Sequence, residues 1–264
     1  MGKDIGETDK ASIRVLLAGE GPTDQGVVDW DSHSRKHVIR EGPCQPLVRK
    51  CAKLMELEIS IAQKSRIRDY LTYMGERKLP KNKEVPGHGM KAWICLNIAF
   101  DDECQAAVVM VDGDKQGESP KDDLHVRKRF VEVHDQLETG FRHAKKITGA
   151  GIECICMVPM RMIESWLMAD PEAFERATGV SRSEVVRIKK PESLWGKDED
   201  PSSDYPKNVM NRLLAGSGFS ANRETFNLIA EEMDLAVLKK RCPVSAVPFI
   251  EEAQNAFDRI ARPA

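Results

Sequence analysis

The sequence has no long hydrophobic run. None of its 264 residues belongs to a stretch that approaches the ~20 apolar residues needed to cross a bilayer. The first ten residues, MGKDIGETDK, have no apolar segment of the kind that a secretory signal contains. The seven cysteines are an odd number and lie mostly among aliphatic neighbours, which favours reduced thiols over a disulfide framework. These absences predict a cytoplasmic protein that makes no contact with a membrane.

Several motifs that carry chemistry in other proteins are also missing. There is no GxxxxGK[ST] loop, so an ATPase would have to be a separate chain. There is no Cys-x-x-Cys and no Cys/His quartet at zinc spacing, and Cys154 and Cys156, on one side of a predicted strand, are interpreted as core residues. His33 and His37 are four residues apart, but their polar surroundings (DSHSRKH) lack the HExxH glutamate and favour a solvated surface.

Charge of one sign is not in excess over the whole chain. Forty basic and 42 acidic residues give a net charge of -2, which excludes a uniformly basic nucleic-acid coat and an acidic disordered tail. The distribution is uneven, however. Residues 35–83 hold 13 basic and five acidic residues, a net charge of +8, and residues 101–118 hold six acids and one lysine, a net charge of -5. This pattern suggests an anion-binding surface beside a cation site; the alternative is a chance segregation of charges on helix faces.

Apolar runs and helical periodicities alternate along the chain. Strands are predicted at 13–18, 57–62, 106–111 and 153–158. Helices are predicted at 44–57, 90–100 and 162–168, and a further helix follows the polar loop KQGESPKDD and ends at about residue 146. From about Arg223 the pattern indicates two further helices. This order predicts an α/β fold, with a mostly parallel sheet flanked by helices and a helical C-terminal extension. Residues 11–172 would form the α/β domain and residues 173–264 the extension packed on it.

Acidic residues come directly after three of these strands. Glu20 follows the first strand, Asp112 and Asp114 follow the third, and Glu164 lies in the first turn of the helix after the fourth. Because carboxyl ends of parallel strands meet at one edge, the four carboxylates are expected to converge there. Such a group needs a cation or bound protons, and oxygen ligands favour Mg²⁺ or Mn²⁺.

Each of these acids also has an explanation without function. Glu20 lies in a Gly-Glu-Gly-Pro turn, where an exposed acid is ordinary. Asp-x-Asp occurs in turns and at helix starts, and an acid such as Glu164 is stabilised by the helix dipole. In the segment after the first strand, Thr23 or Asp24 can cap a helix, and Pro22 excludes a continuing central strand.

The order of the acids resembles that of the Toprim domain of topoisomerases, primases and related nucleases. The resemblance depends on VLLAGEGPTD around Glu20 and VVMVDGD around Asp112 and Asp114. More narrowly, the chain resembles a family of bacterial Toprim-like proteins of unknown function that share GHG (around His88), IESWLMAD, YPKNV and RCPVSAVPF. These matches extend over about residues 11–258. In architecture the chain is similar to overcoming-lysogenisation-defect nucleases, which combine a Toprim domain with an ATPase.

The resemblance implies a Toprim-like Rossmannoid sheet and a Mg²⁺-dependent nuclease. The chain would be the effector partner of a separate ATPase in a bacterial defence-like system. Glu20, Asp112, Asp114 and Glu164 would hold Mg²⁺ (or Mn²⁺), with Glu20 also a general acid or base, and Lys115 would stabilise charge in the transition state. The nucleic acid, DNA or RNA, is expected to meet the basic stretch through Arg35, Lys36, Arg66, Arg68 and His88.

Related activities fit less well. None of the three tyrosines has a context typical of a topoisomerase nucleophile, and no zinc module suggests a primase. A dehalogenase-type phosphatase would need Asp-x-Asp after the first strand, where this chain has Glu20. Two alternatives stay open. One is a non-catalytic interaction or regulatory module that docks on a partner protein, which the low aromatic content of 6% fits. The other is phosphoryl transfer on a small nucleotide.

Overall fold

The protein is described by a computed structural model that covers residues 12–31, 34–53, 55–75, 80, 84–113, 123–149 and 151–262. The predicted site residues Asp114 and Lys115 lie outside the described residues, and so does His33.

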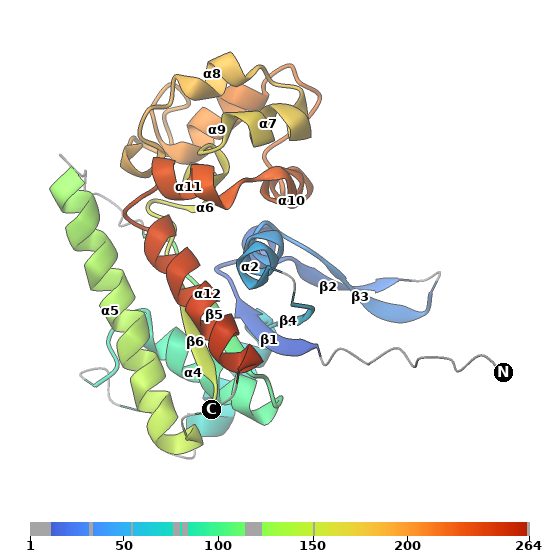
Figure 1. The fold of residues 1–264 in the computed structure, drawn as a ribbon, viewed down its shortest axis with the longest axis vertical. Helices are drawn as coiled ribbons and strands as arrows, with labels where there is room; N and C mark the ends of the chain where they lie inside the picture. The colour runs from blue at the N-terminus through green and yellow to red at the C-terminus, as the bar shows by residue number, and fades with distance from the viewer. Residues whose placement is uncertain are drawn as a thin grey trace.

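Four parallel strands form the central sheet, in the order β4-β1-β5-β6 (Figure 1). Their bounds are β1 (Ile13–Ala18), β4 (Leu57–Ile61), β5 (Ala106–Met110) and β6 (Glu153–Met157). All three pairings are parallel. The predicted α/β fold is therefore confirmed, and each of the four strands lies within a residue of its expected position.

The strand order changes direction beside β1. The chain passes from β1 to β4 on one side of it and then crosses to β5 on the other side. The two crossovers run over opposite faces. Helix α2 (Cys44–Ala52) is part of the β1–β4 crossover and packs in one core. Helix α4 (Gly89–Asp101) is part of the β4–β5 crossover and packs in the other core. The connections after β1 and β5 leave in opposite directions, so the strand order reverses between these two strands, and open α/β sheets typically bind ligands at the carboxyl ends of the strands at such a point.

Successive side chains of each strand enter two different cores, as the pleat requires. Val15 and Leu17 belong to the core with α2 and the C-terminal helices, and Leu16 and Ala18 to the core with α4 and α5 (Asp123–Thr148). Nearly every one of these side chains is fully buried. A sheet covered on both faces explains why the strands are continuous apolar runs.

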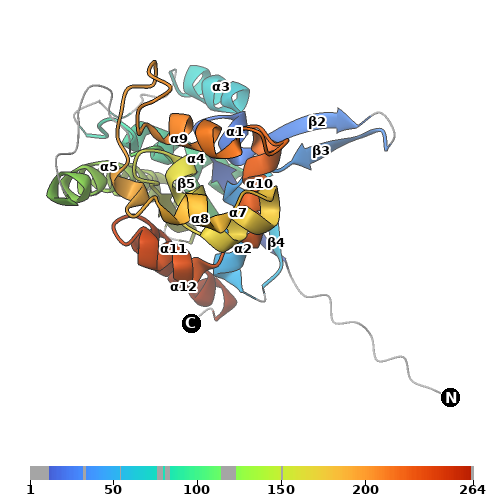
Figure 2. The same ribbon diagram turned by 90° about the horizontal axis from the view of Figure 1, so that it is seen from above.

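The C-terminal half consists of short helices that gather at one end of the sheet and a last helix that returns to it (Figures 1 and 2). These elements are α6 (Ile163–Leu167), α7 (Pro171–Thr178), α8 (Arg182–Val186), a 3₁₀ turn (Pro191–Ser193), α9 (Pro206–Leu214), α10 (Arg223–Glu232), α11 (Leu235–Arg241) and α12 (Ala246–Ala261). Three helices therefore follow residue 223, where the sequence indicated two.

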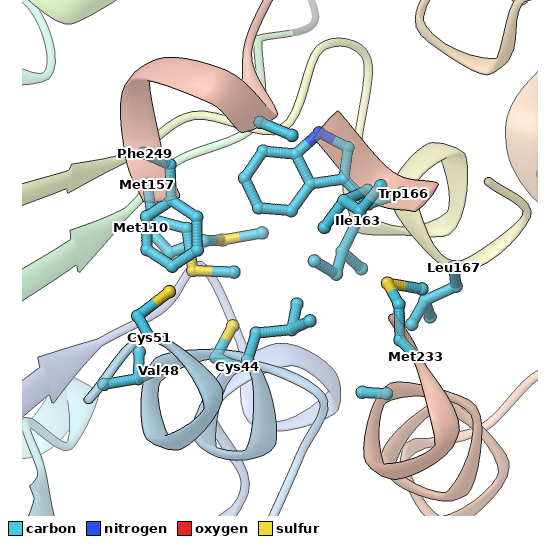
Figure 3. Packing of buried hydrophobic residues seen from close by; sticks show 14 of the residues in the cluster. Cys44, Val48, Cys51, Met110, Met157, Ile163, Trp166, Leu167, Met233 and Phe249 are labelled. Carbon is cyan, nitrogen blue, oxygen red and sulfur yellow. The ribbon is translucent and has the colours of Figure 1, made fainter. Parts of the chain in front are cut away.

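Helix α12 shares one continuous core with the sheet. Figure 3 shows Phe249 of α12 beside Met157 of β6, with Cys51 and Val48 of α2 below them. The rings of Trp166 and Phe249 lie 5.4 Å apart, a separation typical of favourable aromatic pairs. The expected extension thus supplies part of the cover of the sheet, and the boundary at residue 172 stays a prediction.

An antiparallel hairpin that the sequence patterns did not predict projects from the body of the protein. It consists of β2 (Val27–Asp31) and β3 (Lys36–Arg40), and it extends away from the helices in both views (Figures 1 and 2). None of its ten strand residues is fully buried. The hairpin was missed because no apolar run marks it. A one-turn helix, α1 (Pro22–Gln25), and a helix of 12 residues, α3 (Lys64–Gly75), were likewise unpredicted.

No helix among the described residues is long and apolar enough to cross a membrane.

A buried polar network attaches α12 to the rest of the fold. Trp166 Nε1 donates a hydrogen bond of 2.8 Å to Ser245 Oγ. The amides of Val244 and Ser245 donate to the two carboxylate oxygens of Glu192, over 2.9 Å and 2.7 Å, and the Ser245 hydroxyl donates to the same carboxylate. Glu192 therefore satisfies donors at the start of α12 that would otherwise be buried without partners.

We expect Ser245→Ala to destabilise the fold by about 2 kcal/mol, because it leaves the Trp166 indole N–H and one Glu192 oxygen buried with fewer partners. Urea unfolding followed by circular dichroism measures the change. Ser183→Ala is the matched control, since that hydroxyl is exposed. Equal stability of the two variants would contradict the importance of the network.

Candidate functional site

The ends of β1 and β5 bring Glu20 and Asp112 into contact. Glu20 lies two residues after β1, and Asp112 lies two residues after β5. The backbone N–H of Asp112 donates a hydrogen bond of 3.3 Å to Glu20 Oε1. The two strands are direct neighbours in the sheet, so their carboxyl ends lie side by side at the point where the strand order reverses.

Lys91, in the first turn of α4, spans the same two strand ends. Its ammonium group donates to the carbonyl oxygen of Gly19 at 2.8 Å and to that of Met110 at 2.9 Å. Burial lowers the pKa of Lys91, while Cys95 and the carboxylates of Glu20, Asp24 and Asp112 act in the opposite direction. The lysine thus supplies a positive charge beneath the acids and joins β1 to β5 beyond their own pairing.

Asp24 is a further acid at this edge. It lies in α1, which begins at Pro22 with Gly21 as its N-cap, so neither Thr23 nor Asp24 is the N-cap residue. Asp24 still takes part in the cap as the third residue of the helix, because its Oδ2 accepts a hydrogen bond of 3.1 Å from the Gly21 N–H. Burial raises the pKa of Asp24, and the charge of Glu20 adds to this effect, against the Gly21 hydrogen bond and the charges of Lys91 and Lys207.

The surroundings of Asp112 strongly oppose the ionisation of its carboxyl group. Burial raises its pKa well above the usual value, and the charges of Asp24, Glu20 and Glu164 raise it further, while Lys207 lowers it. One oxygen, Oδ1, is buried and has no hydrogen-bond partner among the described residues. A buried carboxylate oxygen without a donor is costly, so this atom is a natural ligand for a proton or a cation.

Glu164 reaches the site from the fourth strand. It lies in the first turn of α6, as predicted, and is only 6% exposed. Burial raises its pKa to about 7; its own backbone N–H lowers the pKa, Asp24 raises it, and Lys207 lowers it. The pKa values of Asp112 and Glu164 both respond to Asp24 and Lys207, which places the acids after β1, β5 and β6 in one electrostatic environment.

The spacing of these acids limits the kind of metal site they can form. Among the described residues, no three of Glu20, Asp24, Asp112 and Glu164 bring their oxygens within 4.8 Å of one another. A closed cage of protein ligands is therefore not present in this part of the chain. Mg²⁺ is commonly held by one or two carboxylates together with water and substrate phosphates, and the unpartnered oxygen of Asp112 beside Glu20 fits that arrangement.

His88 lies at the same edge, directly before α4. Its backbone N–H donates to Gln136 Oε1 at 3.0 Å, which fixes the turn. Burial lowers the pKa of His88, while Glu20 raises it, and Arg129 and Lys91 lower it. The imidazole therefore favours its neutral form, in which it can accept or donate a proton near Glu20.

The other predicted basic residues lie on separate elements. Arg35 and Lys36 are exposed on the β2–β3 hairpin, and Arg66 and Arg68 are exposed on α3. The guanidinium group of Arg66 forms two hydrogen bonds of 2.5 Å with the carboxylate of Asp102. This ion pair occupies donors of Arg66 that a phosphate would need, and the predicted basic residues lie on separate elements rather than on a single one.

The acidic cluster at residues 101–118 is also divided. Asp101, Asp102 and Glu103 come before β5, and Asp112 comes after it. The five residues of β5, at about 3.3 Å per residue, separate the two groups by about 16 Å. The acidic stretch 101–118 is therefore not one cluster in space, and its first three acids lie away from the candidate site. Asp102 pairs with Arg66 and Glu103 with Arg14 instead.

Sequence reasoning missed two residues of the site, Lys91 and Asp24, and gave no chemical role to Lys207. Lys91 is the only basic residue in the mostly apolar helix GMKAWICLNIAFD, and this isolation was a usable signal. Asp24 had only a capping explanation. Lys207 was part of the YPKNV motif, and α9 now places it where its charge acts on Asp112, Asp24 and Glu164.

We expect Glu164→Gln to stabilise the metal-free protein increasingly as pH rises from about 4.5 to 7. In this window the unfolded chain has lost the Glu164 proton and the folded protein retains it, so stability of the wild type falls with rising pH. The difference between variant and wild type should grow by about 3 kcal/mol and then stay constant. Urea unfolding in chelator measures it, with the exposed Glu199→Gln as control. A difference that does not change with pH would contradict the burial of a carboxyl proton.

Comparison with known proteins identifies the family. No curated protein and no solved structure matches the chain. One family model, described as a domain of unknown function (DUF4276), matches residues 40–247. The match contains Lys91, Asp112, Glu164 and Lys207 and begins after Glu20. Since it includes well over half of the sequence, the chain belongs to the DUF4276 family.

Proposed function

We propose that the protein is a Mg²⁺- or Mn²⁺-dependent nuclease of the Toprim type that hydrolyses phosphodiester bonds. The observation that carries the proposal is the buried, unpartnered Oδ1 of Asp112, surrounded by the charges of Glu20, Asp24 and Glu164 at the point where the strand order reverses. Burial, together with repulsion from these acids, opposes ionisation of Asp112, and a divalent cation would offset both effects.

The residues at this edge have separate roles in the proposal. Asp112 and Glu20 hold the cation, and Asp114, which lies outside the described residues, keeps its expected role as a further ligand. Asp112 and Glu20 would hold Mg²⁺ there, and the bound ion would supply polarisation of the phosphodiester and a lower pKa for the attacking water. Lys91 keeps the ends of β1 and β5 at a fixed separation through its two carbonyl contacts. Glu164, with its pKa of about 7, can hold or release a proton near neutral pH and so suits a general acid or base.

Lys207 and His88 are the residues that would contact the substrate in this proposal. Lys207 is exposed on α9, and its charge reaches Asp112 and Glu164, so it can pair with a phosphate oxygen beside the acids. It thereby supplements the role proposed for Lys115 in stabilising negative charge. His88, favoured in its neutral form next to Glu20, can donate a hydrogen bond to the leaving oxygen.

The projecting hairpin is suited to hold a nucleic acid. Trp30 on β2 is 58% exposed and makes an edge contact of 5.2 Å with His37 on β3. Arg35 and Lys36 lie beside this pair at the tip. An exposed aromatic ring next to cationic side chains is the combination that stacks on bases and pairs with phosphates.

The rival proposal is a non-catalytic module that docks on a partner such as an ATPase. It requires no divalent cation at Asp112, because a docking role needs only surface contacts. Metal binding therefore separates the two proposals, even if cleavage depends on a partner chain.

We expect Mg²⁺ or Mn²⁺ to raise the melting temperature of the wild type, and Asp112→Asn to abolish this effect. A cation at 100 times its Kd would stabilise the folded protein by about 2.7 kcal/mol. In an assay with single- and double-stranded DNA and RNA, the same variant should lower metal-dependent cleavage about 100-fold or more. Differential scanning fluorimetry and gel electrophoresis supply the two measurements.

Asp258→Asn is the matched control for this experiment, because it removes an exposed carboxylate from α12. It should retain both the thermal shift and any cleavage. If neither Mg²⁺ nor Mn²⁺ changes the melting temperature of the wild type, the nuclease proposal is overturned and the docking module is favoured. Cleavage that persists in chelator would contradict the proposal as well.

We also expect the double variant Arg35→Ala/Lys36→Ala to bind nucleic acid more weakly and with a smaller dependence on salt. Each lost phosphate contact reduces the slope of log K against log salt by about 0.9 for duplex DNA, so two lost contacts reduce it by about 1.8. Fluorescence anisotropy at several salt concentrations measures the slope. Arg66→Ala serves for comparison, since the pairing of Arg66 with Asp102 predicts a smaller effect. An unchanged slope in the double variant would exclude the hairpin from the interface.

A further inference from the structure

A second group of metal-ligating side chains lies at the β6 edge of the sheet. It combines Cys156 of β6, His134 of α5 and Glu252 of α12. One potential ligand atom of each residue lies within 4.8 Å of those of the other two. These side chains come from three elements that are far apart in the sequence, and none of them belongs to the acids at the ends of β1 and β5.

The three side chains already interact without a cation. His134 Nε2 lies 3.5 Å from Glu252 Oε2, and this contact raises the pKa of His134 against the effect of burial. Burial raises the pKa of the Cys156 thiol, and the charges of Glu252 and Glu138 raise it further. The protein therefore keeps a protonated thiol beside carboxylates and an imidazole, a set that a divalent cation would convert to thiolate, imidazole and carboxylate.

The kinds of donor atom point to a particular metal. Hard cations such as Mg²⁺ prefer oxygen, whereas Zn²⁺ binds sulfur, nitrogen and oxygen together. With Zn–S near 2.3 Å and Zn–N near 2.0 Å, ligand atoms around a tetrahedral ion lie about 3.3–3.8 Å apart. The His134–Glu252 separation of 3.5 Å already has this value. The remaining separations, within 4.8 Å, need only small side-chain movements.

A fourth ligand and an entry path are close by. Glu138 lies one helical turn after His134 on α5, and its carboxylate belongs to a second group of potential ligands with His134 and Asp135. Glu138 and Glu252 also line an open pocket at this edge of the protein. An ion can therefore reach the group from solvent, past two carboxylates.

We propose that Cys156, His134 and Glu252 bind one Zn²⁺ ion, with Glu138 or a water molecule as the fourth ligand. Binding releases the Cys156 thiol proton, and the imidazolium proton of any protonated His134, to the solvent. The ion would connect α12 to α5 across β6, so it would act on the stability of the C-terminal helix rather than on phosphodiester chemistry. Cys154 and Cys156 were predicted to be core residues, and the proposed site would give the Cys156 thiol a second role.

The test uses the full chain, treated with chelator and then given Zn²⁺ or Co²⁺. We expect the wild type to bind one equivalent of Zn²⁺ in competition with a chromophoric chelator. The Co²⁺ form should show the near-ultraviolet charge-transfer band of a cobalt thiolate. Cys156→Ser should abolish the band and weaken Zn²⁺ binding about 100-fold or more. Cys154→Ser, which changes the neighbouring thiol on the same strand, should retain both.

Glu252→Gln provides a second measurement that does not depend on the folding of a cysteine variant. It should weaken Zn²⁺ binding by at least about tenfold, because it replaces an anionic ligand with a neutral amide. A wild type that binds no Zn²⁺ would overturn the proposal, and so would equal binding by Cys156→Ser and Cys154→Ser. Cys156→Ser should keep the thermal shift caused by Mg²⁺, so the failure of one site is distinguishable from the failure of the other.

Discussion

The two hydrogen bonds of Lys91 connect the features on which the candidate site depends. Its ammonium group donates to one carbonyl after β1 and to one at the end of β5. It therefore fixes the ends of the two strands between which the strand order reverses. A buried ammonium is costly without such partners. The nearby acids help to retain its charge, and it in turn limits their repulsion. Strand order, lysine and carboxylates are therefore parts of one arrangement.

Much of the fold could be predicted because strands covered on both faces leave a clear pattern. Residues 106–111 form a continuous apolar run, and burial on both sides explains why no polar residue interrupts it. The hairpin could not be found in this way, since its strands are only partly buried and carry mixed residues. The two strands pair between Val27–Asp31 and Lys36–Arg40, and no alternation of apolar residues in the sequence indicates this pairing.

The candidate site was predictable only where residues follow strands directly. Glu20 and Asp112 could be placed together because parallel strands end at one edge. The positions of Lys91 and Lys207 depend on how α4 and α9 pack, which is a tertiary property without a local signal. The same limit applies to His134, Cys156 and Glu252, because helix packing at an edge strand brings them together from three distant segments. The net charge of residues 101–118 was misleading for a related reason. Strand β5 lies within this segment, so the acids before it and after it lie at opposite ends of the strand.

The position of α12 has a consequence for the order of folding during synthesis. This helix covers the same face of the sheet as α2, and it buries Phe249, Ile250 and Phe257 in the shared core. That face cannot be completed until residues 246–261 have left the ribosome, although all four strands have been made about 90 residues earlier. A nascent chain that stops before α12 would present exposed apolar surface, and chaperone binding would be the natural protection at this stage.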